Sequence, residues 1–116
     1  MSLLLAALAL AAAAPSNTPP QRAGECQWVV GRLTLGNGTP AYRIWPRGTR
    51  RLLGVTNTRF ESEAADVIPA NAARYLRENW TDRVWGHFLV CPLAQERAGR
   101  MRPVRVAAAR KLSRAP

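Results

Sequence analysis

The stretch "CQWVVGRLTLGNGTPAYRIWPRGTRRLLGV", residues 26–55, contains three runs of strand-forming residues separated by two turn signals. The first run, 26–35, is apolar on both faces, which is typical of a strand buried along much of its length. "GNGT" at 36–39 predicts a hairpin turn, because Asn and Gly tolerate positive φ. "PRGT" at 46–49 predicts a second turn. We therefore predict a meander of three strands over 26–35, 40–46 and 50–55.

Beyond the meander the hydrophobic period changes. Ile68, Ala72 and Leu76 stand at helical spacing and Pro69 suits a first helical turn, so we predict a helix of about ten residues. "RVWGHFLVCP" (83–92) and "MRPVRVAA" (101–108) predict a fourth and a fifth strand.

The order β-β-β-α-β-β, with Gly31 bending the first strand, indicates a mainly β fold. It predicts a small OB-like, partly open five-stranded barrel with one helix between strands three and four. A six- or seven-stranded sandwich, or a small α+β sheet with one covering helix, is the alternative.

The chain has two cysteines, Cys26 and Cys91. Cys26 begins the first predicted strand and Cys91 ends the fourth, and these strands are antiparallel neighbours in an OB-like barrel. We therefore predict a disulfide, which an exported protein can keep. Two buried free thiols, or a reactive Cys91, are the alternatives.

The N-terminus indicates export. Residues 2–14 form an uncharged apolar block that is too short to span a bilayer and ends in small residues. We predict a signal peptide over 1–14, with Ala11-Ala12-Ala13 as the recognition triplet, and a periplasmic or secreted protein without a transmembrane anchor. A buried apolar helix or an ordered first strand is the alternative. A flexible proline-containing spacer (15–24), a single domain (25–109) and a basic tail (110–116) follow.

The net charge of +10 is unevenly distributed, with five arginines and no acid between residues 43 and 59. Such blocks indicate an anionic partner: a glycan, a lipid headgroup or nucleic acid. Sixteen of the seventeen basic residues are Arg, which is also typical of a GC-rich genome, so coding bias accounts for part of the excess.

The segment "RIWPRGTRRLLG" (43–54) falls on the second and third strands, which with the 1–2 and 4–5 loops form the usual ligand platform of OB-folds. A cationic groove with an aromatic platform suits a single-stranded nucleic acid or a sugar polymer. The predicted ligand-binding residues are Arg43, Trp45, Arg47, Arg50, Arg51, Arg97 and Arg100. The alternative is that these arginines only keep the outer face of a hairpin soluble.

The other three tryptophans are predicted to be structural. Trp28 and Trp85 lie on the cysteine-bearing strands and are expected to pack over the disulfide. Trp80 follows the helix and is expected to cap the bottom of the barrel.

Catalytic patterns are sparse. His87 is the single histidine and is expected to be a surface or packed residue, and no G-x-S-x-G or Ser-x-x-Lys motif occurs. Two cysteines and a distant histidine do not form a zinc site. Glu61, Glu63 and Asp66 could supply a carboxylate pair for a hydrolase, although a solvated acidic connection is the simpler interpretation. We therefore predict a binding domain without catalytic activity, cofactor or metal; a protein–protein interaction or inhibitor module of the cell envelope is the alternative.

The segments "RIWPRGTRRLLGV", "VWGHFLVCPL" and "GRMRPVRV" together resemble a group of small exported bacterial proteins of uncharacterised function. The resemblance covers most of residues 24–112 and implies export and a single domain. It implies no activity and no site residue.

Overall fold

The computed structural model describes residues 25–56 and 67–116. The predicted signal peptide and spacer, together with Glu61, Glu63 and Asp66, lie outside the described residues. The elements are β1 (Gln27–Leu35), β2 (Tyr42–Pro46), β3 (Leu53–Val55), α1 (Ala70–Glu78), β4 (Arg83–Pro92) and β5 (Arg102–Ser113).

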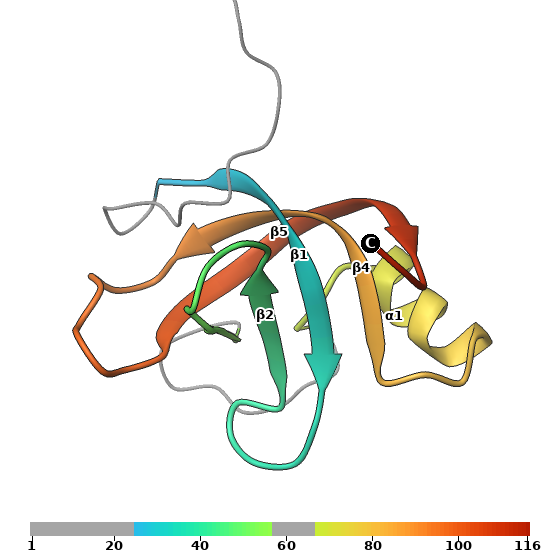
Figure 1. Cartoon of the computed structure of the whole chain (residues 1–116), viewed down its shortest axis with the longest axis horizontal. Coiled ribbons are helices and arrows are strands. Elements are labelled where there is room, and N and C mark those ends of the chain that lie inside the picture. The colour runs from blue at the N-terminus through green and yellow to red at the C-terminus, as the bar shows by residue number, and fades with distance from the viewer. Residues whose placement is uncertain (1–24, 57–66) are drawn as a thin grey trace, which may run out of the picture.

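The five strands form a closed barrel in the order β1-β2-β3-β5-β4, and β4 pairs back onto β1 (Figure 1). Neighbouring strands are antiparallel except β3 and β5, which run parallel with Leu53 opposite Arg102. The helix lies between strands three and four in the chain. The predicted OB-like barrel is therefore confirmed.

Both predicted turns form as their glycines indicate. Gly38 in the first has φ +102° and Gly48 in the second has φ +84°, values that residues with a Cβ rarely adopt. The amide of Thr49 donates to the Pro46 carbonyl at 3.2 Å and closes the second turn.

The largest differences from the predicted strand bounds are in β3 and β5, while β1 and β2 begin one and two residues later than predicted. β3 begins at Leu53 rather than at residue 50, because residues 50–52 form part of the loop that follows β2. β5 continues to Ser113, where its last residues pair with β4, with Arg110 opposite His87. Residues 110–113 are therefore strand and not the beginning of a basic tail.

Inward-facing side chains of all five strands fill the barrel. Its largest fully buried members include Val29, Leu33, Ile44, Phe88 and Val104. The helix α1 covers one end of this core with Ala72 and Leu76, as its spacing predicts, and Asn71 anchors it by donating to the Ala109 carbonyl at 2.7 Å. The β4–β5 connection lies at the opposite end of the barrel (Figure 1).

The predicted disulfide between Cys26 and Cys91 is present, with 4.1 Å between the Cα atoms. It joins the chain just before β1 to the end of β4, next to the β4–β5 connection. The disulfide therefore cross-links the end of the barrel that lies away from α1. No helix among residues 25–56 and 67–116 is long and apolar enough to cross a membrane.

Candidate anion site

Two loops meet at the end of the barrel opposite α1. The loop after β2 supplies Arg50 and Arg51, and the β4–β5 connection supplies Arg97 and Arg100; together they surround a cavity of about 390 Å³. Its charged lining is completed by residues from the same two segments and the start of β5. We call this site the arginine cavity, with the charged residues Arg50, Arg51, Glu96, Arg97, Arg100 and Arg102.

The loops are held by local hydrogen bonds. A turn places Arg97 and Arg100 close together, since the Arg100 amide donates to the Arg97 carbonyl at 3.1 Å and Gly99 has φ +76°. The Leu93 amide donates to the Pro103 carbonyl at 2.9 Å and closes the base of the connection. The side chains of Arg97 and Arg100 are thus presented to solvent from an anchored loop.

The charge of the arginine cavity is strongly positive, with five arginines against one carboxylate among the described lining residues. Glu96 forms an ion pair with Arg51. The side chain of Arg51 is 48% exposed and that of Glu96 is 28% exposed. An ion pair this close to solvent contributes only about 0–1 kcal/mol. Arg51 is therefore partly neutralised by a weak contact, and the other four arginines have no acidic partner among the described lining residues.

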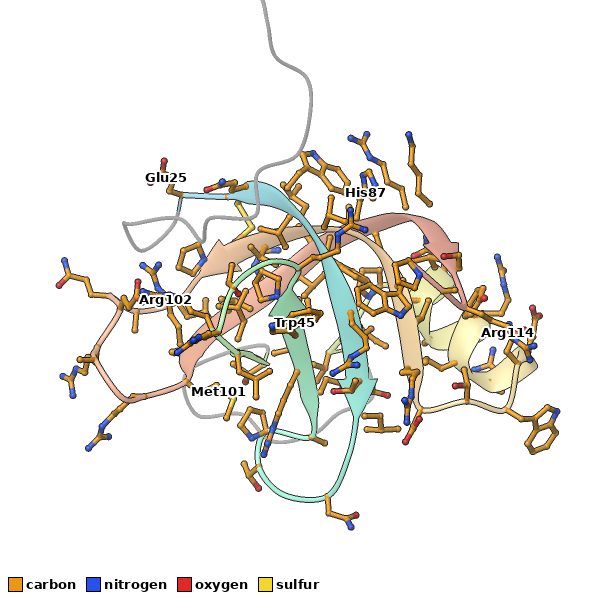
Figure 2. All side chains as sticks on the ribbon, viewed as in Figure 1. Glu25, Trp45, His87, Met101, Arg102 and Arg114 are labelled. Atoms are coloured by element: carbon orange, nitrogen blue, oxygen red, sulfur yellow. A yellow bond between two sulfur atoms is a disulfide. The ribbon has the colours of Figure 1, made fainter. Side chains whose placement is uncertain are left out.

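Arg102 is the residue that sequence reasoning missed. It is only 3% exposed, since it stands in the inward-facing row of β5 with Val104 and Val106. Burial, and to a lesser degree the charge of Arg51, lowers the pKa of the Arg102 guanidinium from its ordinary value, while Glu25 acts in the opposite direction. Figure 2 shows Arg102 and Met101 on the side of the barrel that carries the β4–β5 connection. The alternation Arg102, Val104, Val106 was the signal that could have revealed it.

The remaining predicted site residues lie elsewhere. Arg43 donates through Nε to the Pro40 carbonyl at 3.0 Å and stands beside the β1–β2 turn. Arg47 is exposed in the turn after β2. Neither lines the arginine cavity, so the hairpin is not one continuous site.

Trp45 belongs to a separate cluster on the outer face of the barrel. Its ring lies edge-on to Trp85, with 5.8 Å between centroids. The Arg32 guanidinium lies 5.5 Å from the Trp45 centroid and 5.7 Å from that of Trp85, within cation–π range. We call this cluster, which crosses β2, β1 and β4, the indole row. The Trp45 indole N–H also donates to the Thr49 carbonyl at 2.6 Å, so this side chain is engaged within the fold.

The packing expected for Trp85 and for Trp80 is wrong. Trp85 stands six residues before Cys91 on β4 and contacts the indole row rather than the disulfide. Trp28 stacks on Arg110, whose Cζ lies 4.0 Å from the ring centroid. Trp80 caps nothing, since it is 93% exposed.

Trp80 occupies an unusual backbone position. It follows α1 with φ +49°, and its amide donates to the Arg77 carbonyl while the Thr81 amide donates to that of Leu76. These bonds form a Schellman motif, in which the left-handed position usually carries Gly. The helix end is thus closed by a residue whose side chain stands in solvent at a backbone position that favours glycine.

His87, the single histidine, lies on the outer face of β4, half-buried opposite Val30 and Arg110. Burial lowers its pKa, and the charges of Lys111 and Arg110 lower it further. The described residues contain no group of three His, Cys, Asp or Glu side chains that could hold a metal ion.

Comparison with protein-family models, with curated proteins and with solved structures finds no match to this chain.

Proposed function

We propose that this protein is an exported domain that binds an anionic polymer or surface of the cell envelope, and that the arginine cavity is its binding site. One observation carries the proposal: two loops far apart in the sequence, together with the start of β5, place five arginines around one cavity, with a single carboxylate among the described lining residues. The arginines are Arg50, Arg51, Arg97, Arg100 and Arg102. Like charges gathered in this way repel each other, and a polyanion relieves the repulsion.

Solubility alone accounts poorly for this arrangement. Arginines that only keep a surface hydrated can be distributed over it, whereas these converge from three segments of the chain. A net charge of +10 would also bring polyanions to the protein from a distance. The partner classes are an acidic glycan, anionic lipid headgroups and single-stranded nucleic acid, with the envelope polymers favoured by the predicted export.

The test measures binding of the oxidised protein to an acidic glycan, to anionic vesicles and to a single-stranded oligonucleotide across a salt series. Arg97→Gln/Arg100→Gln removes two exposed charges from the arginine cavity. Arg74→Gln/Arg77→Gln removes two charges from α1 at the other end of the barrel and is the matched control.

We expect at least one ligand to bind with steep salt dependence. The cavity variant should bind about tenfold more weakly and with a shallower salt slope. For the single-stranded oligonucleotide, the slope should fall by up to about 0.7 for each phosphate that the variant no longer neutralises. The control should lose less than about threefold, as expected for charges about a barrel length away. Equal losses in both variants would mean that only the net charge matters and that the cavity is not a site.

A protein–protein interaction module is the second candidate, favoured by Trp80. Trp and Arg are enriched among the few residues that carry most of the binding energy of protein interfaces. Trp80 is flanked by Arg77 and Arg83 in a shallow hollow. Under this proposal Trp80→Ala abolishes capture of an envelope protein, with weak salt dependence, while Arg97→Gln/Arg100→Gln binds it normally. The opposite pattern excludes Trp80 as the contact.

A further inference from the structure

The guanidinium of Arg102 is the most unusual polar group in the described part of the chain. Its Nε donates to the Ala94 carbonyl at 2.9 Å, but Nη1 and Nη2 are both buried and have no hydrogen-bond partner among the described residues. A buried, charged donor left without an acceptor is unfavourable. Two parallel donors held in this way match two oxygens of one oxyanion.

The position of Arg102 determines what could reach it. The residue lines the arginine cavity and also an adjoining hollow of about 350 Å³ on the β4–β5 connection. Each terminal nitrogen exposes less than 1 Å² of surface, so a ligand atom contacts it only when a neighbouring side chain moves. Arg102 therefore provides the deep wall of the site, beneath the exposed arginines.

Glu96 is the side chain best placed to exchange with a ligand. It lines both hollows together with Arg102, and its carboxylate pairs with Arg51. Because this ion pair is close to solvent, breaking it requires little free energy. The carboxylate thus occupies part of an anion site in the free protein.

We propose that the arginine cavity is specific for a phosphate group, with Arg102 as the anchoring residue and Glu96 as an internal competitor. This inference rests on the anion site proposed above. Two phosphate oxygens accept from Nη1 and Nη2 of Arg102, and a third accepts from Arg51 after the Glu96 carboxylate has moved away.

Charge and shape favour phosphate over other anions. A phosphate monoester carries a charge of about −1.5 to −2 near neutral pH and presents three acceptor oxygens. A carboxylate has two oxygens and one charge, so it offers no separate oxygen to Arg51 once both oxygens accept from the Arg102 fork. A sulfate ester has three oxygens but only one charge, which suits five arginines less well.

The experiment compares methyl phosphate, methyl sulfate and acetate as ligands of the oxidised full chain at constant ionic strength, by calorimetry and by the ligand-induced shift in Tm. Three variants are used. Arg102→Lys keeps the charge but removes the fork, and Glu96→Gln removes the competing carboxylate at nearly equal volume. Arg74→Gln on α1 is the control.

We expect methyl phosphate to bind at least tenfold more tightly than the other two anions. Arg102→Lys should lose tenfold or more, Glu96→Gln should bind about threefold more tightly or better, and Arg74→Gln should match the parent. Glu96→Gln tests the inference even if Arg102→Lys folds poorly, because Glu96 is a loop residue on the cavity rim. A folded Arg102→Lys protein with parental affinity, or a Glu96→Gln protein with no gain, would overturn the inference.

The two proposals fail in different ways. If the polymer assay depends on Arg97 and Arg100 while methyl phosphate shows no preference over acetate, the anion site stands and its phosphate specificity is wrong. If methyl phosphate binds as expected while no polymer does, the cavity recognises a small phosphorylated ligand and the polymer proposal is wrong. If nothing binds in either assay, both proposals are wrong.

Discussion

Arg32 and Arg102 are both strand arginines with buried nitrogen atoms that lack a hydrogen-bond partner among the described residues, yet their surroundings differ. Arg32, in the indole row, lies between two tryptophan rings that stabilise its charge. Arg102, in the arginine cavity, has one carbonyl acceptor and other arginines around it.

The difference separates structural cations from cations that are available to a ligand. The aromatic neighbours of Arg32 are part of the fold, so its charge is compensated before any ligand arrives. The positive charge around Arg102 is not balanced by aromatic rings of the fold, and an external anion can neutralise it. Under the proposed function, the indole row therefore contributes stability and the arginine cavity contributes binding.

The largest effect should come from removing the disulfide, which ties down the cavity end of the barrel. Cys26 and Cys91 are separated by 65 residues, and closing such a loop stabilises a protein by roughly 4 kcal/mol in the chain-entropy model. Cys26→Ser/Cys91→Ser should lower the free energy of unfolding by about that amount in urea titrations. A difference below about 1 kcal/mol would show that the barrel end is held without the bridge.

A methyl group added beside the indole row should have the next largest effect. A Cβ on Gly31 would stand 2.3 Å from the Trp45 carbonyl oxygen, a backbone atom that cannot move freely. Gly31→Ala should therefore cost about 1–3 kcal/mol, the usual range for overpacking. Gly36→Ala is the control, since its Cβ meets nothing within 4 Å, and equal Tm values for the two variants would contradict the prediction.

Replacing Arg32 or Arg102 by Met should have opposite effects on stability and on anion binding. Arg32→Met removes two cation–π interactions and should destabilise the protein by about 1–2 kcal/mol without changing anion binding. Arg102→Met removes a buried charge that lacks acceptors among the described residues, so the free energy of unfolding should stay the same or rise, while anion binding is abolished. Urea titrations of both variants and the methyl phosphate assay check this prediction. Loss of binding in Arg32→Met together with loss of stability in Arg102→Met would contradict it.

The smallest effect should be a pH dependence from His87, which lies on the outer face with the indole row. Burial, with Lys111 and Arg110, lowers its pKa below 6.5 in the folded state, so the unfolded chain binds a proton first as the pH falls. The free energy of unfolding should therefore decrease below about pH 6.5, and His87→Gln should remove that part of the decrease. Parallel Tm curves between about pH 5 and 7.5 for the two proteins would contradict it.

Much of the fold could be predicted from local pattern. The run 83–92 became β4 without a change of bounds, and Gly38 and Gly48 adopted the positive φ that their turns require. The extension of β5 over residues 109–113 could not be predicted, because Ala109, Arg110 and Lys111 have neither strand propensity nor alternation. They form strand because β4 offers them hydrogen-bond partners.

The candidate site was predicted in part. The meeting of Arg50 and Arg51 with Arg97 and Arg100 followed from the loop geometry of an OB-like barrel. Trp45 was assigned to the same site, but its actual neighbours come from β1 and β4, and no local pattern reveals cross-strand partners. Trp80 was expected to cap the bottom of the barrel because it follows the helix, whereas the Schellman turn directs it into solvent.

Local chemistry was thus sufficient for the strands, the turns, the helix and the disulfide, because periodicity, glycine and cysteine spacing act over short distances or through one known topology. The roles of the arginines depended on contacts between distant segments. Sixteen arginines look alike in the sequence. Barrel closure places Arg32 between two indoles and leaves Arg102 buried beneath a cationic rim, and this difference in surroundings separates their roles.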